Sequence, residues 1–278
     1  MTDAPIPYCG IPPVPEEVWR NWNLDPVLIA ILAGLVVHYA MAAPRTGVSH
    51  GDRRAGMAGW AVVATVFVSP ICSLSMALFS VRMGQHVVLA LIAAPLLVAG
   101  GAHRCLFWPL SRQVPRLPAG ISCAGGALFF AVAFWGWHLP GPYALTLYSD
   151  AAYWLMQITL IAAALLLWDG ISRMDEAPGA AVGAAIGTGF QMAIYGAILM
   201  FSETAWHGFH ATTTIPFGLS DLDDQRLAAA LMWAPGAIGF LIVGLAFFAG
   251  FLRRLELRSG TGGPATGTAA GSGSRAQG

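Results

Sequence analysis

The side chains of this chain that could do chemistry are mainly soft metal ligands. The sequence holds seven histidines, four cysteines and ten methionines. Met83 and His86 are three residues apart, as are His207 and His210. Side chains at this spacing share one face of a helix. Thioether, thiol and imidazole groups together favour Cu(I), whereas carboxylate clusters favour hard cations. The pattern therefore predicts a copper site.

The candidate copper ligands lie toward one side of the membrane, which the arginine distribution described below identifies as the outside. They are His86, His138, Met83, Met76, Cys72, His207 and His210, with Asp224 and Met232 in supporting positions. Each has a structural alternative, because histidine is common at membrane interfaces and methionine fills gaps in apolar cores. Ser220 to Asp223 has the form of a capping box, which predicts that the last helix begins there.

Signals for other chemistry are missing from the sequence. The chain has no lysine, and neither HExxH nor GxSxG occurs in it. Only His38 lies deep in an apolar run, so paired histidines for a haem are not available. The formal charge of zero excludes a basic nucleic-acid binder. The four cysteines share no short spacing, so we expect neither a zinc site nor a disulfide framework.

The composition places these residues in a membrane protein. Hydrophobic residues make up 56% of the 278 residues, charged residues make up only 10%, and the mean hydropathy is +0.65. Such a chain is too apolar for a soluble domain and belongs in a lipid bilayer. Seven continuous runs are long enough to span it, which predicts an all-α, polytopic bundle. The runs are 27–43, 60–79, 85–102, 119–137, 151–171, 180–201 and 227–252.

The arginines give an orientation for these spans, because short loops rich in positive charge stay in the cytoplasm. Of the 14 arginines, the segments after spans one, three, five and seven hold all but Arg20, Arg82 and Arg226. We therefore expect the N-terminus outside and the C-terminus in the cytoplasm. The expected organisation is an extracytoplasmic tail (1–26), a transmembrane domain (27–252) and a disordered cytoplasmic tail (253–278).

Four segments together resemble the CtaG-type cytochrome c oxidase assembly factors. They read MGQH at 83–86, APLLVAG at 94–100, WGWHLPGPY at 135–143 and DQRLAAALMW at 224–233. The resemblance runs from about the second span to the seventh. It implies a seven-helix protein of the bacterial plasma membrane that assists assembly of a haem-copper oxidase. It also implies that the protein handles copper for the catalytic subunit of that oxidase.

The chain departs from the family pattern at three positions. Relatives often carry a histidine one turn before the position of His86, where this chain has Arg82. Many also have two histidines early in span five, where this chain has Tyr153 and Gln157. If those histidines bind metal in relatives, the resemblance implies that the site in this chain is smaller or built differently.

These observations lead to the hypothesis that the protein is a non-enzymatic assembly factor that binds Cu(I) transiently at the outer face of the membrane. His86 and His138 are the first ligands in this hypothesis. Asp224 is expected to orient a ligand or to bond across helices, since a carboxylate is too hard for Cu(I). The alternatives are a metal-free stabiliser of a nascent oxidase subunit, a haem-binding membrane oxidoreductase and a copper transporter. The sequence leaves the oligomeric state open.

Overall fold

The computed structural model describes residues 6–106 and 117–260, and within these ranges the chain forms helices and no strands. The elements follow the order η1 (Pro15–Arg20), α1 (Pro26–Ala42), η2 (Ala43–Thr46), α2 (His50–Val68), α3 (Ile71–Ala77), α4 (Phe79–Val88), η3 (Leu89–Ala93), α5 (Ala94–Ala99), α6 (Ala102–Leu106), α7 (Ala119–His138), α8 (Pro140–Tyr148), α9 (Asp150–Ser172), α10 (Pro178–Phe201), η5 (Gly208–Ala211), η6 (Ile215–Phe217), α11 (Asp221–Leu231), η7 (Met232–Ile238) and α12 (Gly239–Gly260). The all-α fold class is confirmed.

The helices account for six or seven membrane spans. Six are long and apolar enough to cross a bilayer, and the bent pair of α2 and α3 makes a seventh if it counts as one span. The two halves of this pair meet at 49° around Ser69 and Pro70. Proline has no N–H to continue the helical ladder, which accounts for the bend at Pro70. The predicted continuous span 60–79 is in fact broken there.

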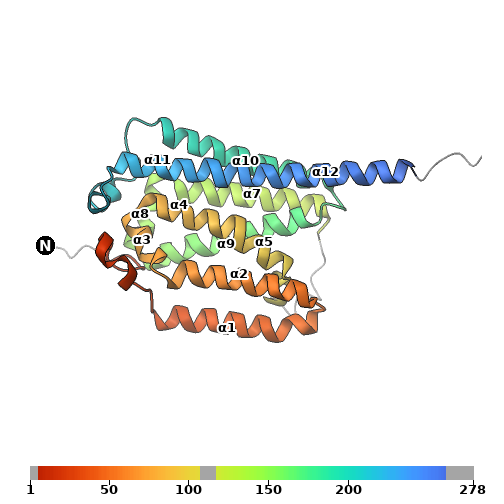
Figure 1. The fold of residues 1–278 in the computed structure, drawn as a ribbon, viewed down its shortest axis with the longest axis horizontal. Coiled ribbons are helices and arrows are strands. Elements are labelled where there is room, and N and C mark those ends of the chain that lie inside the picture. Colours follow the sequence, from red (N-terminus) through yellow and green to blue (C-terminus); the bar gives the residue numbers. More distant parts are fainter. Residues whose placement is uncertain (1–5, 107–116, 261–278) are drawn as a thin grey trace, which may run out of the picture.

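The span formed by α4, η3 and α5 lies at the centre of the bundle. It is the most buried of the spans, whereas α1 is one of the two least buried. Figure 1 shows α1 and α2 along one edge, α10 and α12 along the opposite edge, and α4, α5, α7 and α9 between them. Helix α4 packs on α11, and α7 packs on α9 and α10. A side chain on α4 can therefore meet partners from several helices.

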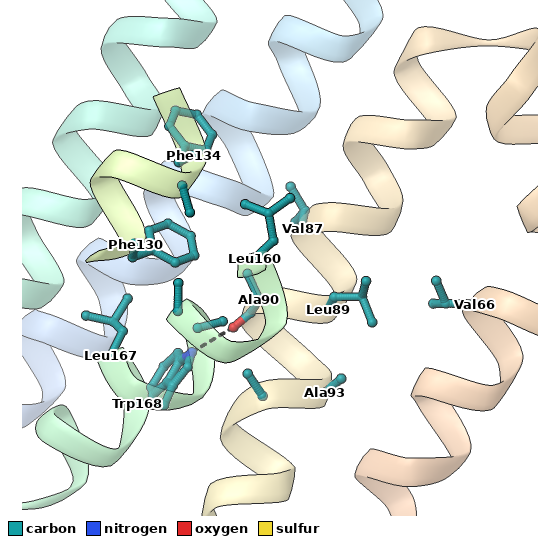
Figure 2. Close-up of a cluster of buried hydrophobic side chains, with 14 of the residues drawn as sticks. Val66, Val87, Leu89, Ala90, Ala93, Phe130, Phe134, Leu160, Leu167 and Trp168 are labelled. Carbon is teal, nitrogen blue, oxygen red and sulfur yellow. Dashed lines mark hydrogen bonds between the residues drawn. The ribbon is translucent and has the colours of Figure 1, made fainter. Parts of the chain in front are cut away.

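Two segments of this bundle are π-helical, and both contain or adjoin a proline. In η3 the N–H of Ala94 bonds to the carbonyl of Leu89, five residues back. In the same register the carbonyl of Ala90 would accept from Pro95, which has no N–H. Trp168 of α9 supplies the missing donor, with its indole N–H 2.6 Å from the Ala90 oxygen (Figure 2). The second segment, η7, contains Pro235.

The N-terminal segment is covalently tied to the bundle. Cys9 and Cys72, at the start of α3, form a disulfide with a Cα–Cα distance of 5.4 Å. The expectation that disulfides play no part in this fold is therefore wrong. The two cysteines are 63 residues apart, so only the folded chain brings them together. Tyr8 also stacks on Tyr153 of α9 at 5.1 Å, so residues before α1 pack on the bundle.

The last helix extends further than expected. The sequence predicted a disordered tail from residue 253, but α12 continues to Gly260. Residues 253–257 keep helical geometry with exposed side chains. Residues 252–257 read LRRLEL and so mix charged and apolar types, which a helix tolerates where one side meets water. The remaining part of the predicted tail, 261–278, lies outside the described residues.

Candidate functional site

A buried pair of histidines joins two helices near one end of the bundle. We call this the histidine end, and define it by His86, His138, His207 and His210: His138 comes just before α8, and His207 and His210 lie in the loop between α10 and α11. Figure 1 shows α3 and α8 at this end of the bundle. His86 comes from α4 and His138 is the last residue of α7. Nδ1 of His86 lies 3.3 Å from Nε2 of His138. The two predicted ligands that were 52 residues apart in sequence are therefore in direct contact.

The hydrogen bonds of this pair fix its tautomers. Nδ1 of His138 lies 2.6 Å from the carbonyl oxygen of Phe134. A carbonyl only accepts, so in the neutral imidazole Nδ1 holds the proton and Nε2 holds a lone pair. Nδ1–H of His86 then donates to that lone pair. Nε2 of His86 is left with a lone pair of its own, and it is buried without a hydrogen-bond partner.

A small cavity adjoins the histidine pair. Its volume is about 20 Å³, which is enough for one water molecule or one metal ion. The lining combines the two histidines and two thioethers with an apolar wall: His86, Val87, Leu89, Ala90, Phe130, Phe134, His138, Leu160, Ile161, Met192 and Met232. Figure 2 shows the apolar wall, with Phe130, Phe134 and Leu160 facing Val87 and Ala90. The wall screens the cavity from water.

Both π-helical segments contribute to this lining. Leu89 and Ala90 belong to η3, and Met232 is the first residue of η7. A π-helical turn inserts one extra residue and so changes which side chains face inward, and such turns are frequent at functional sites. Met232 lines the cavity together with His86 and His138. The supporting position expected for Met232 thus lies at the cavity.

Met192 is a functional candidate that the sequence did not reveal. It lies in α10, is 2% exposed and lines the same cavity. Sorting methionines by their closeness to the helix ends left it out, because Met192 is in the middle of its span. Gly236 of η7 makes room for it: a Cβ at Gly236 would lie 2.7 Å from the Met192 methyl carbon. Only packing between α10 and η7 could show this.

Three predicted sulfur ligands do not line the cavity. Cys72 is bonded to Cys9, so it has no free thiol in this form. The sulfur of Met76 accepts a hydrogen bond from Arg82 at 3.2 Å. Met83 is fully buried in α4, but it is not among the lining residues. Met83 and His86 therefore share a helix face, but only His86 lines the cavity.

The histidines of the loop before α11 pack above the pair. The His207 ring lies 4.3 Å from the Phe79 ring and 4.2 Å from the Tyr143 ring, and neither of its nitrogens has a partner. His210 is fully bonded, through Nε2 to the Tyr143 hydroxyl at 2.8 Å and through Nδ1 to the Ala77 carbonyl at 3.2 Å. Burial lowers the pKa of both His207 and His210 to about 3, so both are neutral.

Asp224 bonds across helices, as expected, and its partners are at the start of α4. Its carboxylate accepts the main-chain N–H of Phe79 at 2.6 Å and of Ser80 at 3.2 Å, and it also accepts the Ser80 hydroxyl. These N–H groups belong to the first turn of α4, where no carbonyl of the same helix can accept a hydrogen bond from them. This cap explains why the helix begins at Phe79, six residues before the predicted span start at Gln85.

The site suits a soft monovalent ion better than a hard one. In the described ranges, no three side chains among His, Cys, Asp and Glu are arranged to hold a metal ion. The available donors are one imidazole lone pair and two thioethers, all neutral. Cu(I) accepts such ligands in low coordination numbers. A binding site with few ligands also allows the ion to leave, because no closed four-ligand cage surrounds it.

The comparisons with known proteins agree with this architecture. Residues 35–254 match the family model described as cytochrome c oxidase caa3 assembly factor. The match covers the central spans and every residue of the cavity. Neither the curated proteins nor the solved structures gave a match. The chain is a multi-pass membrane protein that belongs to the cytochrome c oxidase caa3 assembly factor family.

Proposed function

We propose that this assembly factor binds Cu(I) as cargo and delivers it to the catalytic subunit of the oxidase in the bacterial plasma membrane. One observation carries the proposal. Nε2 of His86 is buried without a partner beside a cavity of about 20 Å³ that is also lined by Met192 and Met232. An unpaired buried acceptor is costly unless a ligand occupies it at some stage. Here the chemistry of its neighbours favours Cu(I).

His86, Met192 and Met232 are the ligands in this proposal, and His138 is a positioning residue. Metal-binding histidines usually donate their second ring nitrogen to an acceptor that fixes the ring orientation. Nε2 of His138 is such an acceptor for Nδ1–H of His86. His138 is itself held by the Phe134 carbonyl. The pair predicted as two ligands therefore divides into one ligand and one residue that orients it.

Two independent features support an outward-facing histidine end. The loops at the opposite end hold most of the arginines, which stay on the cytoplasmic side. The Cys9–Cys72 disulfide lies at the histidine end, and disulfides persist in oxidising compartments outside the cytoplasm. In this orientation the histidine end faces the compartment outside the cytoplasm. The protein acts here as an assembly factor and not as an enzyme.

Copper retention in the purified protein tests the site. The full chain is loaded anaerobically with Cu(I) in detergent and then dialysed against a weak chelator. We expect one bound Cu(I) in the wild type and a loss of at least tenfold in affinity for His86→Ala. Met192→Leu and Met232→Leu are expected to weaken retention while keeping the packing volume. His50→Ala, an exposed histidine in the first turn of α2, is the matched control. Equal retention in the wild type and in His86→Ala would contradict the assignment.

A cellular experiment separates delivery from simple stabilisation. The gene is deleted and restored as wild type or as His86→Ala, and copper content, haem content and activity of the oxidase are measured separately. Copper delivery predicts an oxidase that lacks copper but keeps haem in both the deletion strain and the variant strain. An oxidase with full copper but reduced amount would instead identify a metal-free stabiliser. Uptake of copper into sealed vesicles would identify a transporter.

A further inference from the structure

Arg82 places a permanent positive charge inside the bundle beside the histidine pair. The residue lies in α4 and is 0% exposed. Its guanidinium donates to the hydroxyl of Thr146 at 2.7 Å and to the sulfur of Met76 at 3.2 Å. Its carbon Cζ also lies 5.1 Å from the centre of the Tyr143 ring. All of these partners are neutral, and the guanidinium Nε has no partner at all.

No acidic side chain neutralises this charge within the described residues. None of their carboxylates lies within 4.0 Å of the guanidinium, and the ion pairs formed elsewhere involve other residues. The carboxylate of Asp224 is close to α4, but its oxygens are taken by Phe79 and Ser80 at the start of the helix. Arginine does not lose its proton in proteins. A buried cation without a counterion costs stability, so its presence needs a reason.

The position of Arg82 suggests that reason. It precedes His86 by one helical turn, and residues four apart lie on the same helix face. The Tyr143 ring beside Arg82 also contacts His207 at 4.2 Å, and its hydroxyl bonds to His210. Burial is the main cause of the lowered pKa of His207 and His210, and the charge of Arg82 adds to it. Its field therefore reaches the histidines around the proposed copper site.

We propose that Arg82 is a specificity-determining residue that makes the site select monovalent over divalent metal ions. The inference rests on the proposed function. Repulsion between a fixed cation and a bound ion grows in proportion to the charge of the ion, so a divalent ion meets twice the repulsion of a monovalent one. For charges within about 10 Å at an effective dielectric constant of about 20, this corresponds to about tenfold in affinity for each unit of charge.

The charge of Arg82 is useful because the ligands alone do not fully discriminate between monovalent and divalent ions. Imidazole binds Zn(II) and Cu(II) as well as Cu(I), and thioethers favour Cu(I) only in part. The repulsion also weakens Cu(I) itself, which suits a protein that must release its cargo.

The test compares binding of Ag(I), a stable monovalent substitute for Cu(I), with binding of Zn(II) to the purified full chain in detergent. Three proteins are compared: wild type, the neutral Arg82→Gln and the charge-conserving Arg82→Lys. Removal of the charge is expected to tighten Ag(I) about tenfold and Zn(II) about a hundredfold, so the ratio of the two affinities falls about tenfold. Arg82→Lys is expected to keep the wild-type ratio, which a purely structural role of the guanidinium would not predict.

The outcomes separate this inference from the proposed function. Wild-type protein that binds no Ag(I) would contradict the copper site itself. Binding of Ag(I) with the same Ag(I)/Zn(II) ratio in Arg82→Gln and in wild type would contradict only the role of Arg82. Arg82→Met provides a second neutral variant in case the glutamine variant fails to fold, as judged by size-exclusion chromatography. Wild-type protein that binds Zn(II) as tightly as Ag(I) would overturn the inference without any variant.

Discussion

The carboxylate of Asp224 in α11 caps the first turn of α4 by accepting the main-chain N–H of Phe79 at 2.6 Å. The two residues are 145 positions apart, and both are buried. A cap on a helix is usually a neighbour in sequence, but Leu78, which precedes α4, has no side-chain acceptor. The last span therefore sets where the central span begins, and the central span carries His86.

Replacement of Asp224 by alanine tests this cap. The change leaves two buried N–H groups and the Ser80 hydroxyl without their acceptor, so we expect the free energy of unfolding to fall by about 2 to 3 kcal/mol. Thermal unfolding in detergent measures the effect. Asp223→Ala is the matched control, because its side chain is exposed, where its bond to the Ser220 hydroxyl and its 3.8 Å ion pair with Arg226 contribute little. Similar melting temperatures for the two variants would show that the cap contributes little.

The disulfide between Cys9 and Cys72 makes a prediction about both redox state and stability. Digestion without reductant is expected to give one linked peptide pair, while Cys105 and Cys123 react with a thiol reagent after unfolding. Because the bond closes a loop of 63 residues, its loss in Cys9→Ser should lower the free energy of unfolding by about 2 to 4 kcal/mol. Cys123→Ser is the control. Free Cys9 and Cys72 in protein isolated without reductant would contradict the structure at this point.

The histidines at positions 207 and 210 predict loss of stability at acid pH. Their folded-state pKa is about 3, below the unfolded value of about 6.5. Between these values the unfolded chain binds more protons, so stability is complete above about pH 6.5 and falls as the pH decreases. Each histidine contributes about 1.4 kcal/mol per pH unit.

Melting temperatures from pH 7.5 to 5.5 measure this effect. His207→Phe keeps an aromatic ring against Phe79 and Tyr143 and removes the titrating group, so we expect a shallower dependence on pH. His50→Ala, which changes an exposed histidine, is expected to keep the wild-type slope. Identical slopes for His207→Phe and wild type would mean that His207 does not remain neutral in the folded protein.

Gly236 provides a way to disturb the proposed copper site without removing a ligand. A methyl group at this position would meet the Met192 methyl carbon at 2.7 Å, and the flexible end of Met192 can move away. We therefore expect Gly236→Ala to fold and to retain Cu(I) about tenfold more weakly, because one thioether leaves the cavity. Gly250→Ala is the control, since nothing lies within 4 Å of the added methyl group. Unchanged retention in Gly236→Ala would remove Met192 from the ligand set.

The sequence predicted features of this region only where they depend on residues that are close together in the chain. The spacing of Ser220 and Asp223 predicted the cap of α11, and Ser220 does accept the N–H of Asp223 at 3.1 Å. The same kind of reasoning grouped Met83 with His86, but only His86 lines the cavity, because packing against the neighbouring helices decides which side chains of α4 reach it. Local spacing does not determine which helix faces which.

By itself, the sequence determined an all-α membrane protein and its family, and it predicted a group of histidines near one end of the bundle. Apolar runs and arginine bias are local properties, because the bilayer acts on each segment separately. Only the tertiary structure joined Cys9 to Cys72, brought Met192 beside His86 and left Arg82 buried without a counterion. These relationships depend on contacts between distant helices, and the physical reason is close packing, which no single segment encodes.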